Sequence, residues 1–96
     1  DEVEAGLGGR SALLAGLKLR ELSRGCQVIL ITHEATLAAM ADQHMRVRRD
    51  GDVTVVEDVT GEHRVKEVAR MLSGESKGEA LRHAEALLER YGSKQY

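Results

Sequence analysis

A run of mainly β-branched and aliphatic residues at positions 27–32, with the sequence QVILIT, constrains the fold of this chain more than any other feature. A run of this length and composition is typical of a strand that is covered on both faces, as in a parallel sheet. Residues 10–25 before it carry leucine and alanine at helical spacing and end at Gly25, a residue type that often terminates a helix. Because a helix followed by a buried strand is half of a βαβ unit, we expect a preceding strand that ends at Asp1. The predicted fold class is therefore α/β, with parallel strands flanked by helices.

The rest of the chain predicts a hairpin at the edge of the sheet and three more helices. Asp50 and Gly51 are residue types that favour the positive φ angles of a tight hairpin turn. Apolar residues recur at helical spacing in the last third of the chain, which predicts two amphipathic helices that pack against the sheet. The expected elements are a helix at 34–42, strands at 44–49 and 53–59, helices at about 62–74 and 77–91, and a flexible tail at 92–96.

Composition favours a part of a larger domain over a small self-sufficient one. The 96 residues include no Phe and no Trp, and aromatic residues make up 2% of the chain, whereas small cores are usually anchored by aromatic side chains. No apolar run approaches the roughly 20 residues that cross a bilayer. The single cysteine, Cys26, cannot form an internal disulfide and indicates a reducing, cytoplasmic location. The net charge of −2 neither predicts nor excludes binding to nucleic acid.

Acidic residues and a histidine occupy the expected strand ends, the edge at which α/β sheets bind ligands. Asp1 and Glu2 would point to opposite sides of their strand, so that one could hold Mg²⁺ while the other orients an attacking water in phosphoryl transfer. Two solvated surface acids are the alternative. His33 follows the next strand at the same edge and could form a hydrogen bond to a terminal phosphate. The alternative for His33 is a cap on the helix that follows it.

Residue spacing excludes a zinc site of the metalloprotease type. The sequence HEATL begins at His33 and has Leu37 where a HExxH motif needs its second histidine. The three other histidines fall on separate expected elements and show no ligand spacing. Cys26 has no CxxC partner and is interpreted as a small buried hydrophobic residue.

The order of these motifs resembles the second half of an ABC-type ATPase head. A strand ending in DE, a glycine-rich turn, a helix and a strand ending in TH follow one another, as do the Walker B strand, D-loop and H-loop of such heads. The resemblance implies that Asp1 holds Mg²⁺, mainly through water, and that Glu2 is the catalytic glutamate acting on the attacking water. It further implies that His33 contacts the γ-phosphate of ATP, and that Glu4 and Gly6 face a partner head.

More narrowly, the chain is similar to the RecN family of SMC-like bacterial DNA repair proteins. The stretch DEVEAGLGG resembles the family's DEVDxGIGG, RVKEVARMLSG its RV.EIARMLGG helix, and ALRHAEALL its closing AL.HAKELL. These matches run from Asp1 to about Leu88. Glu4 departs from the usual aspartate, and EAT replaces LPQ after His33. The resemblance implies that residues 1–91 form the C-terminal lobe of a P-loop NTPase head that acts in double-strand break repair and recombination.

A phosphate loop of the form GxxxxGK[ST] does not occur in the 96 residues, so the chain lacks a backbone cradle for ATP phosphates. We expect that loop, the signature segment and the coiled coil upstream of Asp1, and expect this chain to be inactive alone. The implied partners are the N-terminal head lobe, a second head in a homodimer, and DNA through the full-length protein. Another SMC-like or ABC head is one alternative reading.

The other alternative is a non-catalytic α/β interaction module. Its support comes from the missing phosphate loop and from Arg46, Arg48 and Arg49, which could contact the phosphates of a nucleic acid. Arg46 and Arg48 share one face of their expected strand. We favour the interpretation that these arginines form a solvated edge that discourages strand pairing.

Overall fold

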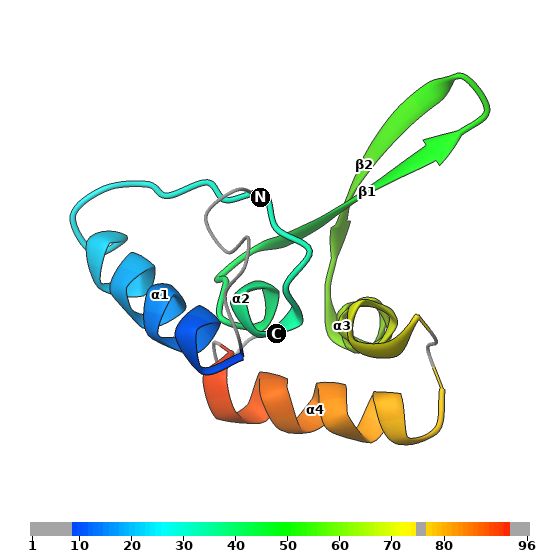
Figure 1. Cartoon of the computed structure of the whole chain (residues 1–96). Coiled ribbons are helices and arrows are strands. Elements are labelled where there is room, and N and C mark those ends of the chain that lie inside the picture. The colour runs from blue at the N-terminus through cyan, green and yellow to red at the C-terminus, as the bar shows by residue number, and fades with distance from the viewer. Residues whose placement is uncertain (1–8, 75–76, 93–96) are drawn as a thin grey trace.

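The computed structural model describes residues 9–74 and 77–92 of the chain. It is a small α/β structure with one two-stranded antiparallel sheet and four helices among these residues. Figure 1 shows the helices grouped at one end and the sheet projecting from them. The elements are α1 (Gly9–Leu22), α2 (Ala35–Ala39), β1 (His44–Asp50), β2 (Val53–Val59), α3 (Gly61–Ser73) and α4 (Glu79–Tyr91).

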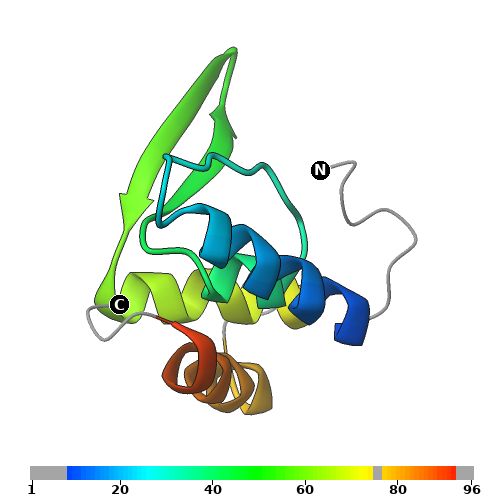
Figure 2. The same cartoon turned by 90° about the vertical axis from the view of Figure 1, so that its left-hand side faces the viewer.

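Helix α2 lies at the centre of the helical group and contacts α1, α3 and α4 (Figures 1 and 2). The core is built mainly from small side chains, which let the helix backbones approach closely. At Gly16 of α1, an added Cβ atom would lie 2.5 Å from the Sδ atom of Met40, so this position has no room for a side chain without a shift of Met40. The fully packed cluster consists of Ala35, Ala39, Val68, Ala69, Ala84 and Leu88.

The two C-terminal helices confirm the periodicity seen in the sequence. Helix α3 buries Val68 and Ala69 and ends at Gly74, whose left-handed φ of 82° suits a glycine and whose N–H donates to the carbonyl of Arg70. Helix α4 buries Ala84 and Leu88 against α3 and α2. These helices pack mainly on one another and on α2, and α3 also contacts β2. The prediction that both helices cover a parallel sheet is therefore wrong for the described residues.

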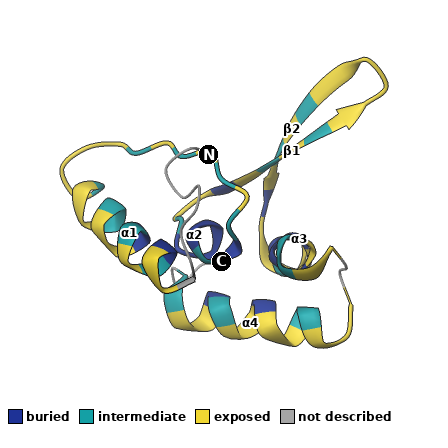
Figure 3. Cartoon of the chain, viewed as in Figure 1, coloured by how far each residue is buried: buried dark blue, intermediate teal, exposed yellow. Residues whose placement is uncertain are grey.

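The predicted hairpin, two strands joined by a tight turn at Asp50 and Gly51, is confirmed. Strands β1 and β2 pair antiparallel from His44↔Val59 to Asp50↔Val53, and the turn places Gly51 at a φ of 63°. Figure 3 shows that the hairpin is mostly exposed toward its tip and becomes buried where it meets the helices. The side chains of Met45, Val47 and Val56 are each more than half exposed.

The strand predicted at residues 27–32 is not formed. Residues 27–34 are irregular, and within the described part of the chain no strand runs beside them. The side chains of Ile29 and Ile31 are 78% and 76% exposed. A strand needs a neighbour to bond its backbone groups, so an isolated segment with strand-like composition gains no ladder hydrogen bonds here. The parallel sheet is therefore absent from the described residues.

Candidate functional site

The structure places one of the five predicted site residues. Asp1, Glu2, Glu4 and Gly6 lie outside the described residues, so their predicted roles stay predictions. His33 lies within them, as an exposed residue in the segment that leads into α2.

A local turn directs the chain from His33 into α2. The Oγ1 atom of Thr32 accepts a hydrogen bond from the backbone N–H of Glu34, with a distance of 2.9 Å. The carbonyl of Glu34 then accepts from the N–H of Ala38, which closes the first turn of the helix. Glu34 occupies the N-cap position with extended backbone angles. Glu34, and not His33, therefore occupies the N-cap position, and His33 lies one residue before it.

Two arginines from other helices hold the opposite end of α2. Arg64 of α3 is 2% exposed, and its Nη2 atom donates to the carbonyls of Ala38, Ala39 and Ala41 at 3.1, 3.4 and 2.7 Å. Arg20 of α1 donates through its Nη2 atom to the carbonyl of Met40 at 2.6 Å and also to the carbonyl of Tyr91 at the end of α4. A positive charge at a helix C-terminus interacts favourably with the helix dipole. We call Arg20 and Arg64 the arginine clamp.

A buried histidine lies close to the clamp. His44 begins β1, and its Nδ1 atom has no hydrogen-bond partner among the described residues. Burial lowers the pKa of His44, and the nearby charge of Arg64 lowers it further, while Glu67 opposes this effect. Burial likewise lowers the pKa of Arg64, with Asp42 acting in the opposite direction. His44 is therefore neutral at pH 7, beside a permanently charged guanidinium.

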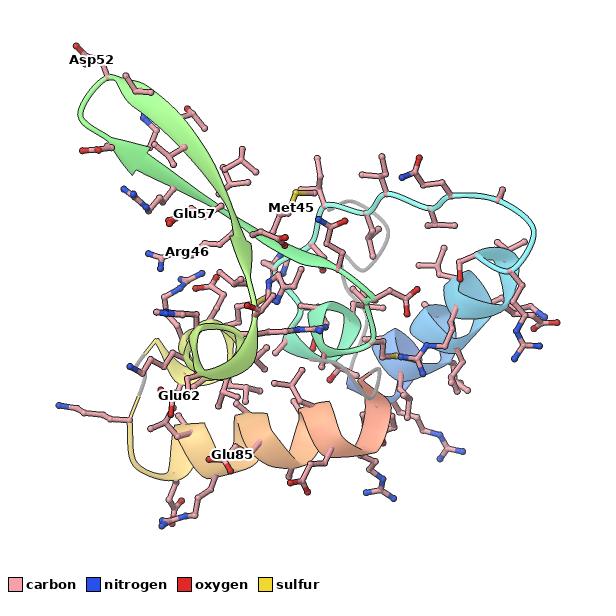
Figure 4. The ribbon with its side chains drawn as sticks, turned by 180° about the vertical axis from the view of Figure 1, so that it is seen from behind. Met45, Arg46, Asp52, Glu57, Glu62 and Glu85 are labelled. Carbon is pink, nitrogen blue, oxygen red and sulfur yellow. The ribbon has the colours of Figure 1, made fainter. Side chains whose placement is uncertain are left out.

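Two of the three hairpin arginines that could contact phosphates form ion pairs within the chain. Arg46 forms an ion pair with Glu67 of α3, and Arg48 forms one with Glu57 across the hairpin. Figure 4 shows Arg46 and Glu57 on the side of the hairpin that faces α3, with Met45 on the other side. Arg46 and Glu57 border a groove of about 450 Å³ between the hairpin and α3. The same groove is lined by Asp58, Lys66, Glu67 and Arg70. The groove therefore carries charge of both signs.

The described residues contain no group of three or more His, Cys, Asp or Glu side chains that could hold a metal ion. The predicted Mg²⁺ ligand, Asp1, is outside them. None of the helices in residues 9–74 and 77–92 has the length and apolar character needed to span a bilayer.

Sequence reasoning missed the arginine clamp. The available signal was that Arg64 falls one helical turn before Val68, on the buried stripe of α3, where a charged residue is unexpected. No comparable signal marked Arg20, because its acceptors are backbone carbonyls 20 and 71 residues away.

Comparison with known proteins identifies the family. The chain is 46% identical over 94 residues to the DNA repair protein RecN of Streptomyces coelicolor, a match that covers 93% of the chain and 16% of that protein. It is 44% identical over 92 residues to RecN of Deinococcus radiodurans, with 92% and 16% covered. The chain belongs to the RecN family. RecN of Treponema pallidum is 42% identical over 100 residues, which covers 99% of the chain and 17% of that protein.

These matches confirm the resemblance to RecN that was drawn from the motifs. The chain spans 16–17% of the length of these RecN proteins and corresponds to a C-terminal part of them. A scan against protein-family models gave no match. The helical group and the hairpin are therefore the structure of one part of a RecN protein.

Proposed function

We propose that this chain is part of an ABC-type ATPase head that acts in DNA double-strand break repair and recombination. The observation that carries the proposal is the 42–46% identity to proteins named DNA repair protein RecN over 92–99% of the chain. The ordered DE and TH motifs at Asp1, Glu2 and His33 supply the chemistry. Action on chromosomal DNA gives it a cytoplasmic, nucleoid-associated location.

The exposed run at residues 27–32 supports the P-loop fold that this function requires. Four consecutive aliphatic residues follow Gln27, and two of them, Ile29 and Ile31, leave more than three quarters of their surface open to water. Covering an Ile side chain stabilises a protein by about 1.5–3 kcal/mol. In the proposed head, the remaining lobe provides the neighbouring strands and helices that cover this run, and residues 27–32 become a parallel strand.

The residue types fit ATP and Mg²⁺. Carboxylate oxygens are preferred ligands of Mg²⁺, which suits Asp1, and the exposed imidazole of His33 can donate a hydrogen bond to a phosphate oxygen. Glu2 would orient the water that attacks the γ-phosphate, and a Mg²⁺ ion held by Asp1 would supply positive charge for the phosphates. The phosphate loop that holds the nucleotide comes from the rest of the head.

Glu4 and Gly6 act in the engagement of two heads. ATP held between two heads draws them together, Glu4 and Gly6 face the partner head in the homodimer, and hydrolysis releases the contact. The work on DNA is then done by the full-length protein with its coiled coil. The non-catalytic alternative has less support, because Arg46 and Arg48 are already bound to carboxylates of this chain.

The test is the Glu2→Gln variant of the full-length protein. We expect ATP turnover to be lost while ATP still brings two heads together, because the amide keeps the shape of the side chain but cannot accept a proton. Steady-state phosphate release and ATP-dependent crosslinking of heads measure the two properties. Glu62→Gln, an exposed acid on α3, is the matched control and should leave both unchanged. Near-normal turnover in Glu2→Gln would overturn the proposed function.

A further inference from the structure

Helix α2 is too short to hold itself in place. It has five residues, and isolated helices of fewer than about 12 residues are marginal in water. The last four carbonyls of any helix lack partners within it. Here the carbonyls of Ala38 and Ala39 at the end of α2, and those of the next two residues, Met40 and Ala41, accept hydrogen bonds from the arginine clamp, three from Arg64 and one from Arg20. The arginine clamp thus supplies hydrogen-bond donors to carbonyls at the end of this short helix.

The clamp ties α2 to every other helix of the described structure. Arg64 reaches it from α3 and Arg20 from α1, and Arg20 also binds the carbonyl of Tyr91 at the end of α4. The two guanidinium groups therefore link the C-terminal end of α2 to α1, α3 and α4.

Stability alone does not explain Arg64. It is 2% exposed, the carbonyl oxygens of α2 are its acceptors, and its Nε atom has no partner within the described residues. Burying a charge costs several kcal/mol before its hydrogen bonds are counted, and apolar residues of similar volume often replace buried charges without loss of stability. A methionine or leucine would fill the same space but would not bond three carbonyls at once. These hydrogen bonds indicate that Arg64 serves to hold the C-terminal end of α2 in a fixed position.

The fixed end of α2 lies close in the chain to His33. Five residues separate His33 from Ala39, and the Thr32–Glu34 hydrogen bond and the first helical turn leave little slack between them. A helix of this length spans about 7.5 Å, so a shift of its C-terminal end is carried to its start. Reacting groups must be held to within a fraction of an ångström, and a misplacement of 1 Å can cost about 100-fold in rate.

We propose that Arg20 and Arg64 are positioning residues, which set the place of His33 at the γ-phosphate of ATP by holding the C-terminal carbonyls of α2. This proposal rests on the proposed function. Neither arginine touches the nucleotide. Their loss should therefore lower kcat for ATP hydrolysis and leave the affinity for ATP nearly unchanged.

The experiment uses the full-length protein and a double-mutant cycle. Arg64→Met removes the charge and keeps the volume, and Arg64→Lys keeps the charge but replaces the planar guanidinium with an ammonium on a shorter side chain. We expect both to lower kcat, Arg64→Met by about 10-fold or more, with KM changed less than about 3-fold. In a His33→Ala background, Arg64→Met should add no further loss, because the two residues act as one unit. Arg82→Met, an exposed arginine of α4, is the matched control.

A second variant guards against simple misfolding. This variant is Arg20→Lys. The side chain of residue 20 is half-buried and reaches α2 from α1, so the substitution leaves the buried core intact. We expect it to lower kcat and to speed amide hydrogen exchange at residues 38–41. Independent, additive losses in the cycle, or normal kcat in Arg64→Met or Arg20→Lys, would overturn the positioning role. If Glu2→Gln abolishes turnover while the clamp variants are normal, this proposal fails and the proposed function stands. Normal turnover in Glu2→Gln overturns the proposed function itself.

Discussion

Arg46 on strand β1 and Glu67 on helix α3 form an ion pair that joins the hairpin to the helical group, with 3.6 Å between Nε and Oε1. The two partners are unequally buried, since Glu67 is 6% exposed and Arg46 is 40% exposed. Arg70 completes the arrangement by donating to both carboxylate oxygens of Glu67, at 2.9 and 2.6 Å. One buried carboxylate therefore serves two guanidinium groups from different elements.

Replacing Glu67 should destabilise the junction between hairpin and helices. Removing one partner of a fully buried pair leaves the other charge uncompensated and costs about 3–5 kcal/mol. Arg46 and Arg70 are partly exposed, so the expected cost of Glu67→Ala is smaller, about 2–3 kcal/mol. Thermal unfolding and amide exchange of β1 and α3 in the full-length protein measure the loss. Glu62→Ala in the exposed first turn of α3 is the control, with an expected cost below about 1 kcal/mol. Equal effects of the two substitutions would contradict the assignment.

His44 predicts a pH dependence of stability below neutrality. Its pKa in the folded chain is lowered by burial and by Arg64 and Arg70, against the opposing charges of Glu67 and Asp58. Between this lowered pKa and the ordinary value near 6.5, the unfolded chain binds more protons than the folded chain. Stability should therefore fall as the pH falls below about 6.5 and should be fully present above it.

Unfolding at a series of pH values from about 7.5 to 5 tests this linkage. A His44→Gln variant should lose part of the slope that the parent shows in this range. The exposed His83 of α4 provides the comparison, since His83→Gln should retain the parent slope. The same slope in the parent and in His44→Gln would show that another group causes any pH dependence.

The sequence was sufficient for elements whose signals are local. The spacing of Val65, Val68 and Leu72 predicted α3, and Asp50 with Gly51 predicted the hairpin turn. The strand at residues 27–32 was predicted from composition, yet a strand forms only beside another strand, and the described residues provide none. The local residue pattern indicates which secondary structure a segment can form. Whether a strand forms also depends on the elements beside it.

The sequence also predicted one part of the candidate site and not the other. His33 was recognised from its place after an aliphatic run, whereas Asp1, Glu2, Glu4 and Gly6 stay predictions because they lie outside the described residues. The clamp could not be predicted from spacing, since its acceptors are backbone carbonyls, which every residue type has, at separations of 20 to 26 residues for α2. Only the packing of four helices brings these groups together.

The aliphatic run provides the test of the larger fold. Ile29 and Ile31 are two residues apart, a spacing that would place them on one face of a strand, and they are 78% and 76% exposed here. If the rest of the head covers them, the double substitution Ile29→Glu and Ile31→Glu buries two charges and should lower the stability of the full-length protein by about 3 kcal/mol or more. Differential scanning calorimetry measures this as a lower unfolding temperature. Substitutions at exposed positions change stability by about 0.5 kcal/mol or less. Val47 in the middle of β1 is 65% exposed, so Val47→Glu is the control. An unfolding temperature as high as that of the parent would mean that residues 27–32 stay uncovered in the full-length protein, and that the parallel strand does not form there either.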